Sequence, residues 1–302
     1  MTKFRNSRVR WNKVTLVGVG LLGGSLGLAL RQRRLADSVS GFVRRAATAK
    51  ECLSLGATDV ATRNLREAVT GADLVVLCTP IAQMAPLLAQ ICPFLAPGAI
   101  VTDVGSVKQS LVENLEPLAR QAGAHFVGSH PMAGSEKTGV GAARADLFAG
   151  AVCVVTPTPR SNRNAIGRVA ELWKSVGSQV LRLTPGQHDE LVSRSSHLPH
   201  VVAAQLANLV LHPQGAKHLA RLCANGFRDT TRIASGSPEM WRDIALANRK
   251  NLSCAIDSFV DGLTGFKRAL SRGDAEAISR FFEQAKSQRD RWAKHAQPHS
   301  PE

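Results

Sequence analysis

An uncharged stretch near the amino terminus restricts what this chain can fold into more than any other feature. It spans residues 14–30, reads VTLVGVGLLGGSLGLAL and follows a basic start, as the apolar part of a secretion signal would. Five glycines interrupt it, it stops at Arg31, and no small-residue cleavage site follows. Its 17 residues also fall short of the roughly 20 that a membrane helix needs. We therefore expect neither export nor a membrane anchor, and we place the stretch inside a globular fold.

The same stretch divides into a strand, VTLVGV, and a helix that is expected to begin near Leu21. Between them Gly18, Gly20 and Gly23 have the spacing G-x-G-x-x-G. In that motif the first glycine permits a tight turn, the second lets a pyrophosphate approach the backbone, and the third lets the helix pack on the strand. The free N–H groups of the helix start then face the phosphates. The pattern predicts a dinucleotide-binding turn that includes Leu21 and Leu22.

The end of the next predicted strand bears on the choice of cofactor. SVSGFVRRAAT reads as a short strand ending near Val43, followed by Arg44 and Arg45. A site selective for NAD usually has an acidic residue at this strand end, which holds the ribose hydroxyls. A carboxylate would repel a 2′-phosphate, whereas an arginine can pair with it. We predict that NADP is the preferred cofactor and NAD the second choice.

Strands and helices continue to alternate along the first part of the chain. Apolar strands are predicted at 72–80, 98–106, 124–131 and 151–157, and helices at 48–55, 81–91 and 108–122. Apolar strands separated by helices indicate an α/β fold with a sheet covered on both faces. In such sheets ligands bind beyond the carboxyl ends of the strands, where the polar segments 78–80, 103–108 and 128–139 lie. The expected cofactor contacts there are Cys78, Thr79, Pro80, Asp103 and Ser106.

Strand signals disappear from about Thr184 onward. Ser237-Pro238 is a clear helix start, and the segment from Met240 to beyond Trp292 has helical periodicity. We predict a basic tail at 1–12, a dinucleotide-binding domain at 13–183 and an all-helical domain at 184–295. Long helices with more apolar surface than a small bundle can bury often complete their cores by dimerising. The helical domain is therefore expected to form a homodimer.

Two segments of the helical part carry groups capable of chemistry. In SSHLPH, His197 and His200 share one helical face, and Pro199 is expected to kink the turn between them. A metal needs at least a third ligand, and His188 does not extend the pair convincingly, so we expect no metal. The two histidines are either substrate contacts or buried structural residues. In GFRDTTRIA, Arg228 and Arg232 lie one turn apart, as substrate contacts or as part of a solvated helix start.

The charge and the cysteines limit the class of partner. The net charge of +15 suits an anionic partner, but the arginines are dispersed and only 5% of residues are aromatic. A nucleic-acid surface with stacking aromatics is therefore not expected, and a small acidic substrate is. The six cysteines have no zinc or redox spacing. We expect reduced, mostly buried thiols in a cytoplasmic protein.

Taken together and in this order, GVGLLGGS, TDVGSVK, GSHPMAGSEKTG, SHLPH, GFRDTTRIA and MWRDI resemble the prephenate/arogenate dehydrogenase family over roughly residues 13–290. The resemblance implies a Rossmann-type doubly wound sheet followed by an all-helical dimerisation domain. It also implies oxidative decarboxylation of prephenate to 4-hydroxyphenylpyruvate, or of arogenate to tyrosine, with a hydride passed to NAD(P)⁺. The substrate would be a small dicarboxylate of tyrosine biosynthesis.

The resemblance also implies roles for individual residues. A neutral histidine is well suited to remove a hydroxyl proton near pH 7 because its pKa lies close to the operating pH. By resemblance, His130 is that base and Ser106 hydrogen-bonds the same substrate oxygen. Arginine suits a carboxylate because it can bind both oxygens. The implied substrate contacts are Arg232 for the ring carboxylate, His200 and His197 for the side-chain end, Glu136 and Trp241 as cleft-lining residues, and Arg228 as a further cation.

Two alternatives remain open at this stage. A β-hydroxy acid dehydrogenase of the same architecture would use a lysine base, for which Lys108 and Lys137 are the candidates. A non-catalytic dinucleotide sensor or a nucleic-acid binder would have no need of His130, Ser106 and Arg232 together. Prephenate is favoured over arogenate by the motifs.

Overall fold

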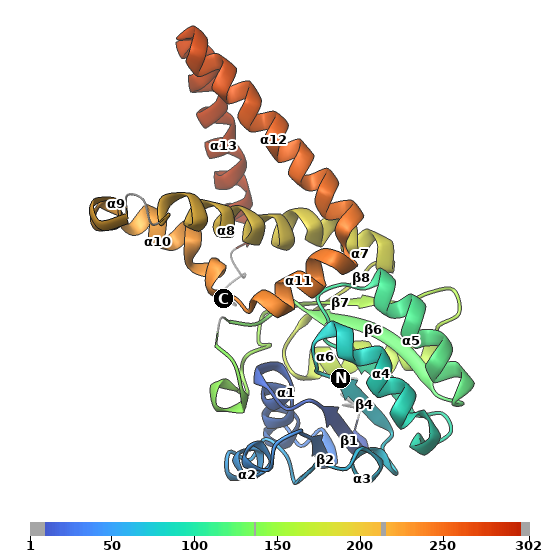
Figure 1. Ribbon diagram of the computed structural model, residues 1–302. Coiled ribbons are helices and arrows are strands. Elements are labelled where there is room, and N and C mark those ends of the chain that lie inside the picture. Colours follow the sequence, from blue (N-terminus) through green and yellow to red (C-terminus); the bar gives the residue numbers. More distant parts are fainter. Residues whose placement is uncertain (1–9, 136, 213–215, 297–302) are drawn as a thin grey trace, which may run out of the picture. The chain divides into compact units, whose positions relative to one another are not determined.

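The computed structural model describes residues 10–135, 137–212 and 216–296. It contains two compact units, the first ending at Asn248 and the second beginning at Arg249. The first unit holds the sheet together with the helices up to Asn248 (Figure 1). Every residue of the predicted site that the structure describes lies in this unit.

The sheet has eight strands in the order β3-β2-β1-β4-β5-β6-β7-β8. Its pairs are parallel except β6 with β7, which is antiparallel. The strand order reverses between β1 and β4, which is the switch point where α/β sheets bind ligands. The strand bounds are β1 (Trp11–Val17), β2 (Ala36–Phe42), β3 (Val60–Thr62), β4 (Leu74–Leu77), β5 (Ile100–Asp103), β6 (His125–Pro131), β7 (Val152–Thr156) and β8 (Gln179–Arg182).

Both faces of the sheet are covered by helices. Neighbouring strand residues point to opposite faces, so Leu74 and Val76 join one buried core while Val75 and Leu77 join the other. The first core includes α1 (Leu21–Gln32), α2 (Ala46–Ser54) and α6 (Arg163–Ser175). The second includes α3 (Leu65–Val69), α4 (Ile81–Ile91) and α5 (Gln109–Gln121). The predicted α/β fold with a doubly covered sheet is confirmed.

Helices follow the sheet to the end of the first unit. Thr184 caps the first of them through a capping box with Gln187, and the Ser237 hydroxyl accepts the N–H of Met240 at the start of the last. The predicted helix start at Ser237-Pro238 is thereby confirmed. The bounds are α7 (Pro185–Val192), the π-helix η3 (Ser193–His197), α8 (Leu198–Val210), α9 (Ala216–Leu222), α10 (Asn225–Thr231), the short η4 (Arg232–Ser235) and α11 (Pro238–Ala247). Two further short helices are η1 (Cys92–Phe94) and η2 (Val140–Ala142).

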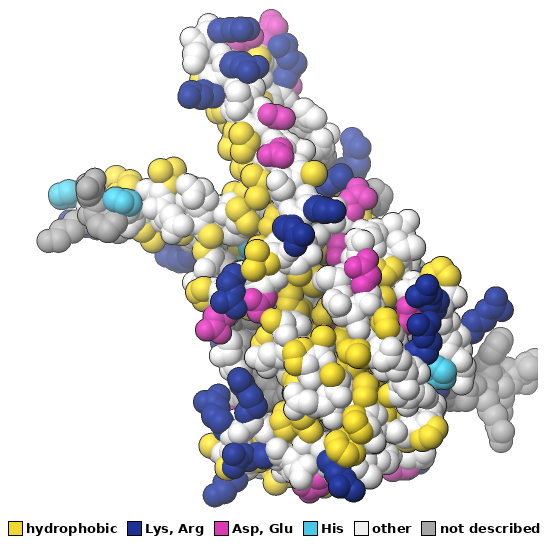
Figure 2. All heavy atoms as spheres, turned by 45° about the vertical axis from the view of Figure 1, so that its right-hand side comes forward, with side chains coloured by type: hydrophobic (Ala, Val, Ile, Leu, Met, Phe, Trp, Pro, Cys, Tyr) yellow, Lys and Arg dark blue, Asp and Glu magenta, His cyan; other side chains and the backbone are white. Residues whose placement is uncertain are grey.

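The second unit consists of two long helices, α12 (Arg249–Arg272) and α13 (Ala275–Ala296). Gly273, at φ +64°, makes the turn between them, where the left-handed backbone favours glycine. Phe266 packs on Phe281, with ring centroids 4.7 Å apart. Other large apolar side chains stay exposed, including Phe282 at 58% and Trp292 at 61%, and hydrophobic side chains line these helices in Figure 2. Two helices alone cannot cover so much apolar surface.

The cysteines differ in part from expectation. All six are free thiols, as predicted. Only Cys52 and Cys153 are buried, however, and Cys254 is exposed on α12, so the prediction of mostly buried thiols was wrong. Cysteine type alone does not distinguish the core face of a helix from its open face. Among the residues that the structure describes, no helix is both long enough and apolar enough to cross a bilayer.

Candidate active site

The glycine turn after β1 has the geometry that its sequence spacing requires. Gly18 has φ +95°, and a Cβ there would lie 2.8 Å from the Thr79 side chain. A Cβ on Gly23 would lie 2.2 Å from the Gly18 carbonyl oxygen, so helix and strand approach as closely as glycine allows. Around Gly20 nothing lies within 4 Å of that position, and no side chain caps α1 there. The backbone N–H groups at the start of α1 are therefore uncapped and lie beside open space at Gly20. This arrangement fits a pyrophosphate.

Replacing Gly23 by alanine is expected to weaken NAD(P)⁺ binding by roughly 10- to 100-fold. The new methyl would collide with the Gly18 carbonyl, and overpacking of this kind costs about 1–3 kcal/mol. Gly167→Ala in α6 is the matched control, because no atom lies within 4 Å of its Cβ position. Titration of both variants with reduced cofactor, followed by nicotinamide fluorescence, gives the comparison. Equal affinities would show that the turn does not hold the cofactor.

The other predicted cofactor residues lie around this turn. Cys78, Thr79 and Pro80 connect β4 to α4, and the Cys78 carbonyl would lie 3.1 Å from a Cβ on Gly18. The Thr79 hydroxyl is buried and has no hydrogen-bond partner among the described residues, which leaves it available to a ligand. Arg44 and Arg45 follow the buried Val43 and are both exposed. The residues present thus fit a dinucleotide.

Asp103 has a structural environment that its motif did not predict. Its carboxylate forms an ion pair with Lys108, both side chains being fully buried, and accepts the N–H groups of Gly105 and Ser129 at 2.8 and 3.1 Å. Lys108 Nζ also donates to the Ser129 carbonyl at 2.8 Å. These contacts join the ends of β5 and β6. A cofactor contact by Asp103 remains a prediction.

The same ion pair weighs against the β-hydroxy acid alternative. A catalytic lysine must reach the substrate and give up its proton, but Lys108 has a buried carboxylate and a carbonyl as partners. Lys137, the other candidate, is exposed on the loop after β6. Neither lysine has the environment of a general base.

His130 lies near the carboxyl end of β6 and is 7% exposed. Its Nδ1 lies 2.8 Å from Nε2 of His188 on α7, and Nδ1 of His188 lies 2.7 Å from Oδ1 of Asp189. The Asp189 carboxylate also accepts two backbone N–H groups at the start of α5, from Lys108 at 2.7 Å and from Gln109 at 2.9 Å. A continuous hydrogen-bonded chain therefore runs from α5 through α7 to His130.

Burial keeps these histidines neutral. It lowers the pKa of His130 well below its usual 6.5, and the nearby His188, Lys108 and His197 lower it further. Burial also lowers the pKa of His188, although its hydrogen bond to Asp189 opposes the shift. A neutral His130 can accept a proton at pH 7.

His197 and His200 converge on Trp241 from the start of α8. The His200 ring stacks on Trp241, with centroids 3.7 Å apart, while His197 meets it edge-on at 6.1 Å. Asn248 places its amide nitrogen 3.2 Å from His197 Nδ1 and 2.8 Å from the Asp189 carbonyl. The π-helix η3 ends at His197, and Pro199 lies in the first turn of α8, where proline is tolerated because the N–H it lacks would be unpaired in any case; the kink at Pro199 stays a prediction.

The two histidines differ in burial. Both hypotheses from the sequence, substrate contacts or buried structural residues, remain open. His197 is 1% exposed, and burial lowers its pKa to about 4. A backbone hydrogen bond to Ser106 opposes that shift and raises the pKa. His200 is half-buried, and its Nδ1–H donates to the Ser196 carbonyl at 2.8 Å. Its pKa is lowered by burial first and by the charge of Arg232 as a smaller cause.

The remaining predicted residues are placed as follows. Arg232, in η4, is exposed and within electrostatic reach of His200. Arg228, on α10, is exposed one turn earlier, and Ser106 is half-buried between β5 and α5. Glu136 lies outside the described residues. Within residues 10–135, 137–212 and 216–296, no three His, Cys, Asp or Glu side chains are grouped as metal ligands.

Comparison with known proteins identifies the family. Residues 26–182 match the family model for the nucleotide-binding domain of prephenate dehydrogenase, and residues 184–284 match the model for its dimerization domain. The chain belongs to the prephenate dehydrogenase family. A prephenate dehydrogenase of Bacillus subtilis is 34% identical over 92% of this chain and 75% of its own length.

Solved structures of the prephenate dehydrogenase family share the whole fold. A prephenate dehydrogenase from A. aeolicus in complex with hydroxyphenyl propionate and NAD⁺ is 32% identical, with a TM-score of 0.87 over 93% of this chain and 98% of that one. An arogenate dehydrogenase from Synechocystis is 31% identical, with a TM-score of 0.79 over 93% and 99% of the two chains. The predicted family resemblance is confirmed.

From the sequence, His188 was considered only as a weak candidate metal ligand. Asp189 was not singled out. The available signal was a pair of ionisable residues, HD, in the first turns of a helix with a strong capping box. Both side chains are almost fully buried, at 0% and 1% exposure. Helical periodicity alone does not show what such a pair contacts.

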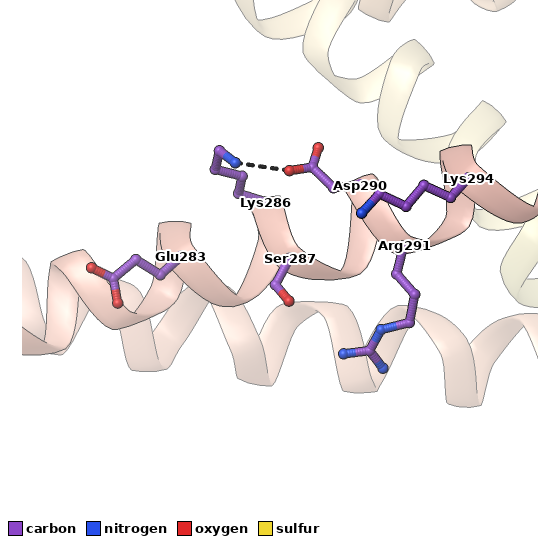
Figure 3. A pocket seen from close by; sticks show the side chains of 6 residues that line it. All are labelled: Glu283, Lys286, Ser287, Asp290, Arg291 and Lys294. Carbon is purple, nitrogen blue, oxygen red and sulfur yellow. Dashed lines mark hydrogen bonds and ion pairs between the residues drawn. The ribbon is translucent and has the colours of Figure 1, made fainter.

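A separate hollow of about 430 Å³ lies on α13 of the second unit (Figure 3). Its lining comes from one helix and is mostly charged, and Lys286 forms an ion pair with Asp290 at 2.8 Å. Side chains of a single exposed helix do not enclose a ligand. The lining residues are Glu283, Lys286, Ser287, Asp290, Arg291 and Lys294.

Proposed function

We propose that this chain acts on prephenate in preference to arogenate, prefers NADP⁺ to NAD⁺, and uses His130 as its general base. The broader activity follows from family membership: oxidative decarboxylation of prephenate or arogenate with hydride transfer to NAD(P)⁺, in tyrosine biosynthesis. The observation that carries the proposal is the buried His130 near the carboxyl end of β6, whose Nδ1 lies 2.8 Å from Nε2 of His188.

His130 handles the proton of the reaction. One ring nitrogen takes the proton of the substrate hydroxyl as the hydride leaves the same carbon. Bound NAD(P)⁺ supplies the hydride acceptor. The bond to the ring carboxylate then breaks, releasing carbon dioxide, and its electron pair makes the ring aromatic with the charge on the former carbonyl oxygen. That oxygen takes the proton back from His130, so the base is regenerated and no metal is needed.

The predicted substrate-binding groups suit a substrate with two carboxylates. Arg232 is proposed to pair with the ring carboxylate, and Ser106 to hydrogen-bond the reacting oxygen. His200 and His197 would contact the side-chain end, where the Nε2–H of His197, whose Nδ1 accepts from the Asn248 amide, can donate to a substrate oxygen. Glu136, Trp241 and Arg228 stay proposed lining residues. A non-catalytic sensor would have no use for this combination, which favours an enzyme.

The substrate and cofactor choices are tested together. Purified protein is given prephenate or arogenate, each with NADP⁺ or NAD⁺, and reduced nicotinamide is followed by absorbance. We expect the highest kcat/KM with prephenate and NADP⁺. Turnover of a β-hydroxy acid without turnover of prephenate or arogenate would support the alternative dehydrogenase instead.

Arg44→Asp is expected to weaken NADP⁺ binding by roughly 10- to 100-fold while changing NAD⁺ binding little. A hydrogen bond to a charged group contributes about 1.5–3 kcal/mol, and aspartate would also repel the 2′-phosphate. Arg160→Asp is the matched control: Arg160 is also exposed, but it follows β7, which runs antiparallel to β6 and therefore ends at the opposite end of the parallel strands. An equal loss of affinity for NADP⁺ and NAD⁺ would show that Arg44 does not bind the 2′-phosphate.

The assembly and compartment are proposals at the same level. The exposed apolar side chains of α12 and α13, together with the match to a dimerization domain, support a homodimer formed through the helical region. Sedimentation should then give twice the chain mass of 32.3 kDa. We place the division between the cofactor and helical domains near 183/184 and the protein in the cytoplasm, without nucleic acid or membrane as a partner.

A further inference from the structure

Donor and acceptor can be assigned for each hydrogen bond in the series Asp189–His188–His130 from the chemistry of the groups. The series begins at Asp189, whose carboxylate receives the N–H groups of Lys108 and Gln109 at the start of α5. A helix amino terminus stabilises negative charge, and an ionised carboxylate only accepts hydrogen bonds. Nδ1 of His188, 2.7 Å from Asp189 Oδ1, must therefore carry the proton of that contact.

The direction of the second hydrogen bond follows from the first. A neutral imidazole has one N–H, so with Nδ1 protonated the Nε2 of His188 is an acceptor. The Nδ1 of His130, 2.8 Å away, then donates to it. The remaining ring nitrogen of His130, Nε2, is left with a lone pair. Two contacts thus select one tautomer of His130 out of two.

We propose that His188 and Asp189 are positioning residues for the reaction: they hold His130 as its Nδ1–H tautomer and present Nε2 to the substrate hydroxyl. This inference rests on the proposed role of His130 as general base. Proton transfer from the hydroxyl to Nε2 makes His130 an imidazolium, whose Nδ1–H bond to His188 strengthens. Asp189 stabilises that positive charge through His188, much as an aspartate does for the histidine of a serine protease.

The burial of His188 and Asp189 fits a positioning role, because solvated surface residues would be exposed. His188 is fully buried and Asp189 is 1% exposed. The other charged groups beside them, Lys108 and Asp103, neutralise each other in their own ion pair. Asn248, at the carboxyl end of α11, donates to the Asp189 backbone carbonyl, while the Asp189 carboxylate joins α7 to the start of α5. The buried His188 ring is thus held by hydrogen bonds on both of its nitrogens, to Asp189 and to His130.

The first test compares His188→Leu with His188→Gln. Leucine removes the acceptor for His130 Nδ1–H, so kcat with prephenate should fall by roughly 10- to 100-fold, part of the 10²- to 10⁴-fold that a general base contributes. KM should change less than kcat. The glutamine amide oxygen can accept the same N–H and should restore part of the rate. His125→Leu, at the amino end of the same strand, is the matched control and should keep wild-type kcat.

The decisive measurement is a double-mutant cycle with His130→Asn. If His188 acts through His130, adding His188→Leu to His130→Asn should not slow the enzyme further. A general structural role would instead multiply the two losses, which would overturn the inference. A normal rate for His130→Asn alone would overturn the proposed function itself. A slow His130→Asn beside an unimpaired His188→Leu would overturn only the relay.

A measurement on the unmodified protein covers the case in which His188→Leu does not fold. Nitrogen-15 NMR of labelled histidines distinguishes a protonated ring nitrogen from one with a lone pair, and His130→Asn and His188→Gln spectra assign the two signals. We expect Nδ1 to be protonated in both His130 and His188 at pH 7. Protonation of His130 at Nε2 instead would contradict the proposal.

Discussion

His130→Asn is expected to lower kcat with prephenate by roughly 10²-fold or more while KM changes little. Asparagine is close in size and can still take part in hydrogen bonds, but it cannot accept a proton near neutral pH. A positioned general base contributes about 10²- to 10⁴-fold. Steady-state kinetics at saturating NADP⁺ measure the change. His125→Asn, on the amino end of β6, serves as the control for a histidine lost from the same strand.

The expected pH dependence of kcat differs between the wild type and His130→Asn. Burial lowers the pKa of His130 well below 6.5, so the base is already neutral at pH 7 and stays so at higher pH. The rate of the wild type should therefore be flat upward from pH 6.5 as far as this group is concerned. It should fall on the acid side, once pH drops below the lowered pKa and His130 is protonated. That acid limb should be absent from His130→Asn, and its persistence there would assign it to another group.

Arg232→Ala is expected to raise KM for prephenate by roughly 10- to 100-fold, with a smaller effect on kcat. It leaves a substrate carboxylate without its partner, and loss of a hydrogen bond to a charged group costs about 1.5–3 kcal/mol. Arg232→Lys should recover only part of the affinity, because lysine keeps the charge but not the two parallel N–H donors. Initial rates over a range of prephenate concentrations give both constants.

Arg242→Ala is the matched control for Arg232. Arg242 is also exposed, on the neighbouring α11, and its guanidinium bonds the Asp243 carboxylate at 2.7 and 2.9 Å. Its loss should leave KM near the wild-type value. If Arg232→Ala lowered kcat alone while His130→Asn raised KM alone, the roles assigned to the two residues would be contradicted.

Several parts of the structure were missed because their local signals are weak. The predicted strands and helices around β4, α4, β5, α5, β6 and β7 are present within a few residues of their expected bounds. β3 has three residues and β8 four, most of them partly or fully exposed, so neither shows the apolar run of a central strand. α6 was not predicted either, although its local signal was clear. Asn162 caps it, and one face buries Val169 and Trp173.

The sequence by itself determined the fold class, the glycine turn and the family, because each depends on residues close together in the chain. Helical period, strand period and the Gly18–Gly23 spacing are local properties, and steric limits on glycine act within a single turn. His130 and Arg232 were proposed as site residues in the same way, by the resemblance of short motifs.

Only the tertiary structure decided what surrounds His130, the proposed base. His130 meets His188 from 58 residues away, and Asp189 meets the start of α5 from 81 residues away. Those contacts arise because α7 packs against α5 and the end of β6, which no local pattern specifies. The assembled fold also buries the Lys108–Asp103 ion pair, which weighs against Lys108 as the candidate base that the sequence had left open. Burial supplies the lowered pKa of His130, and burial is a property of the assembled fold.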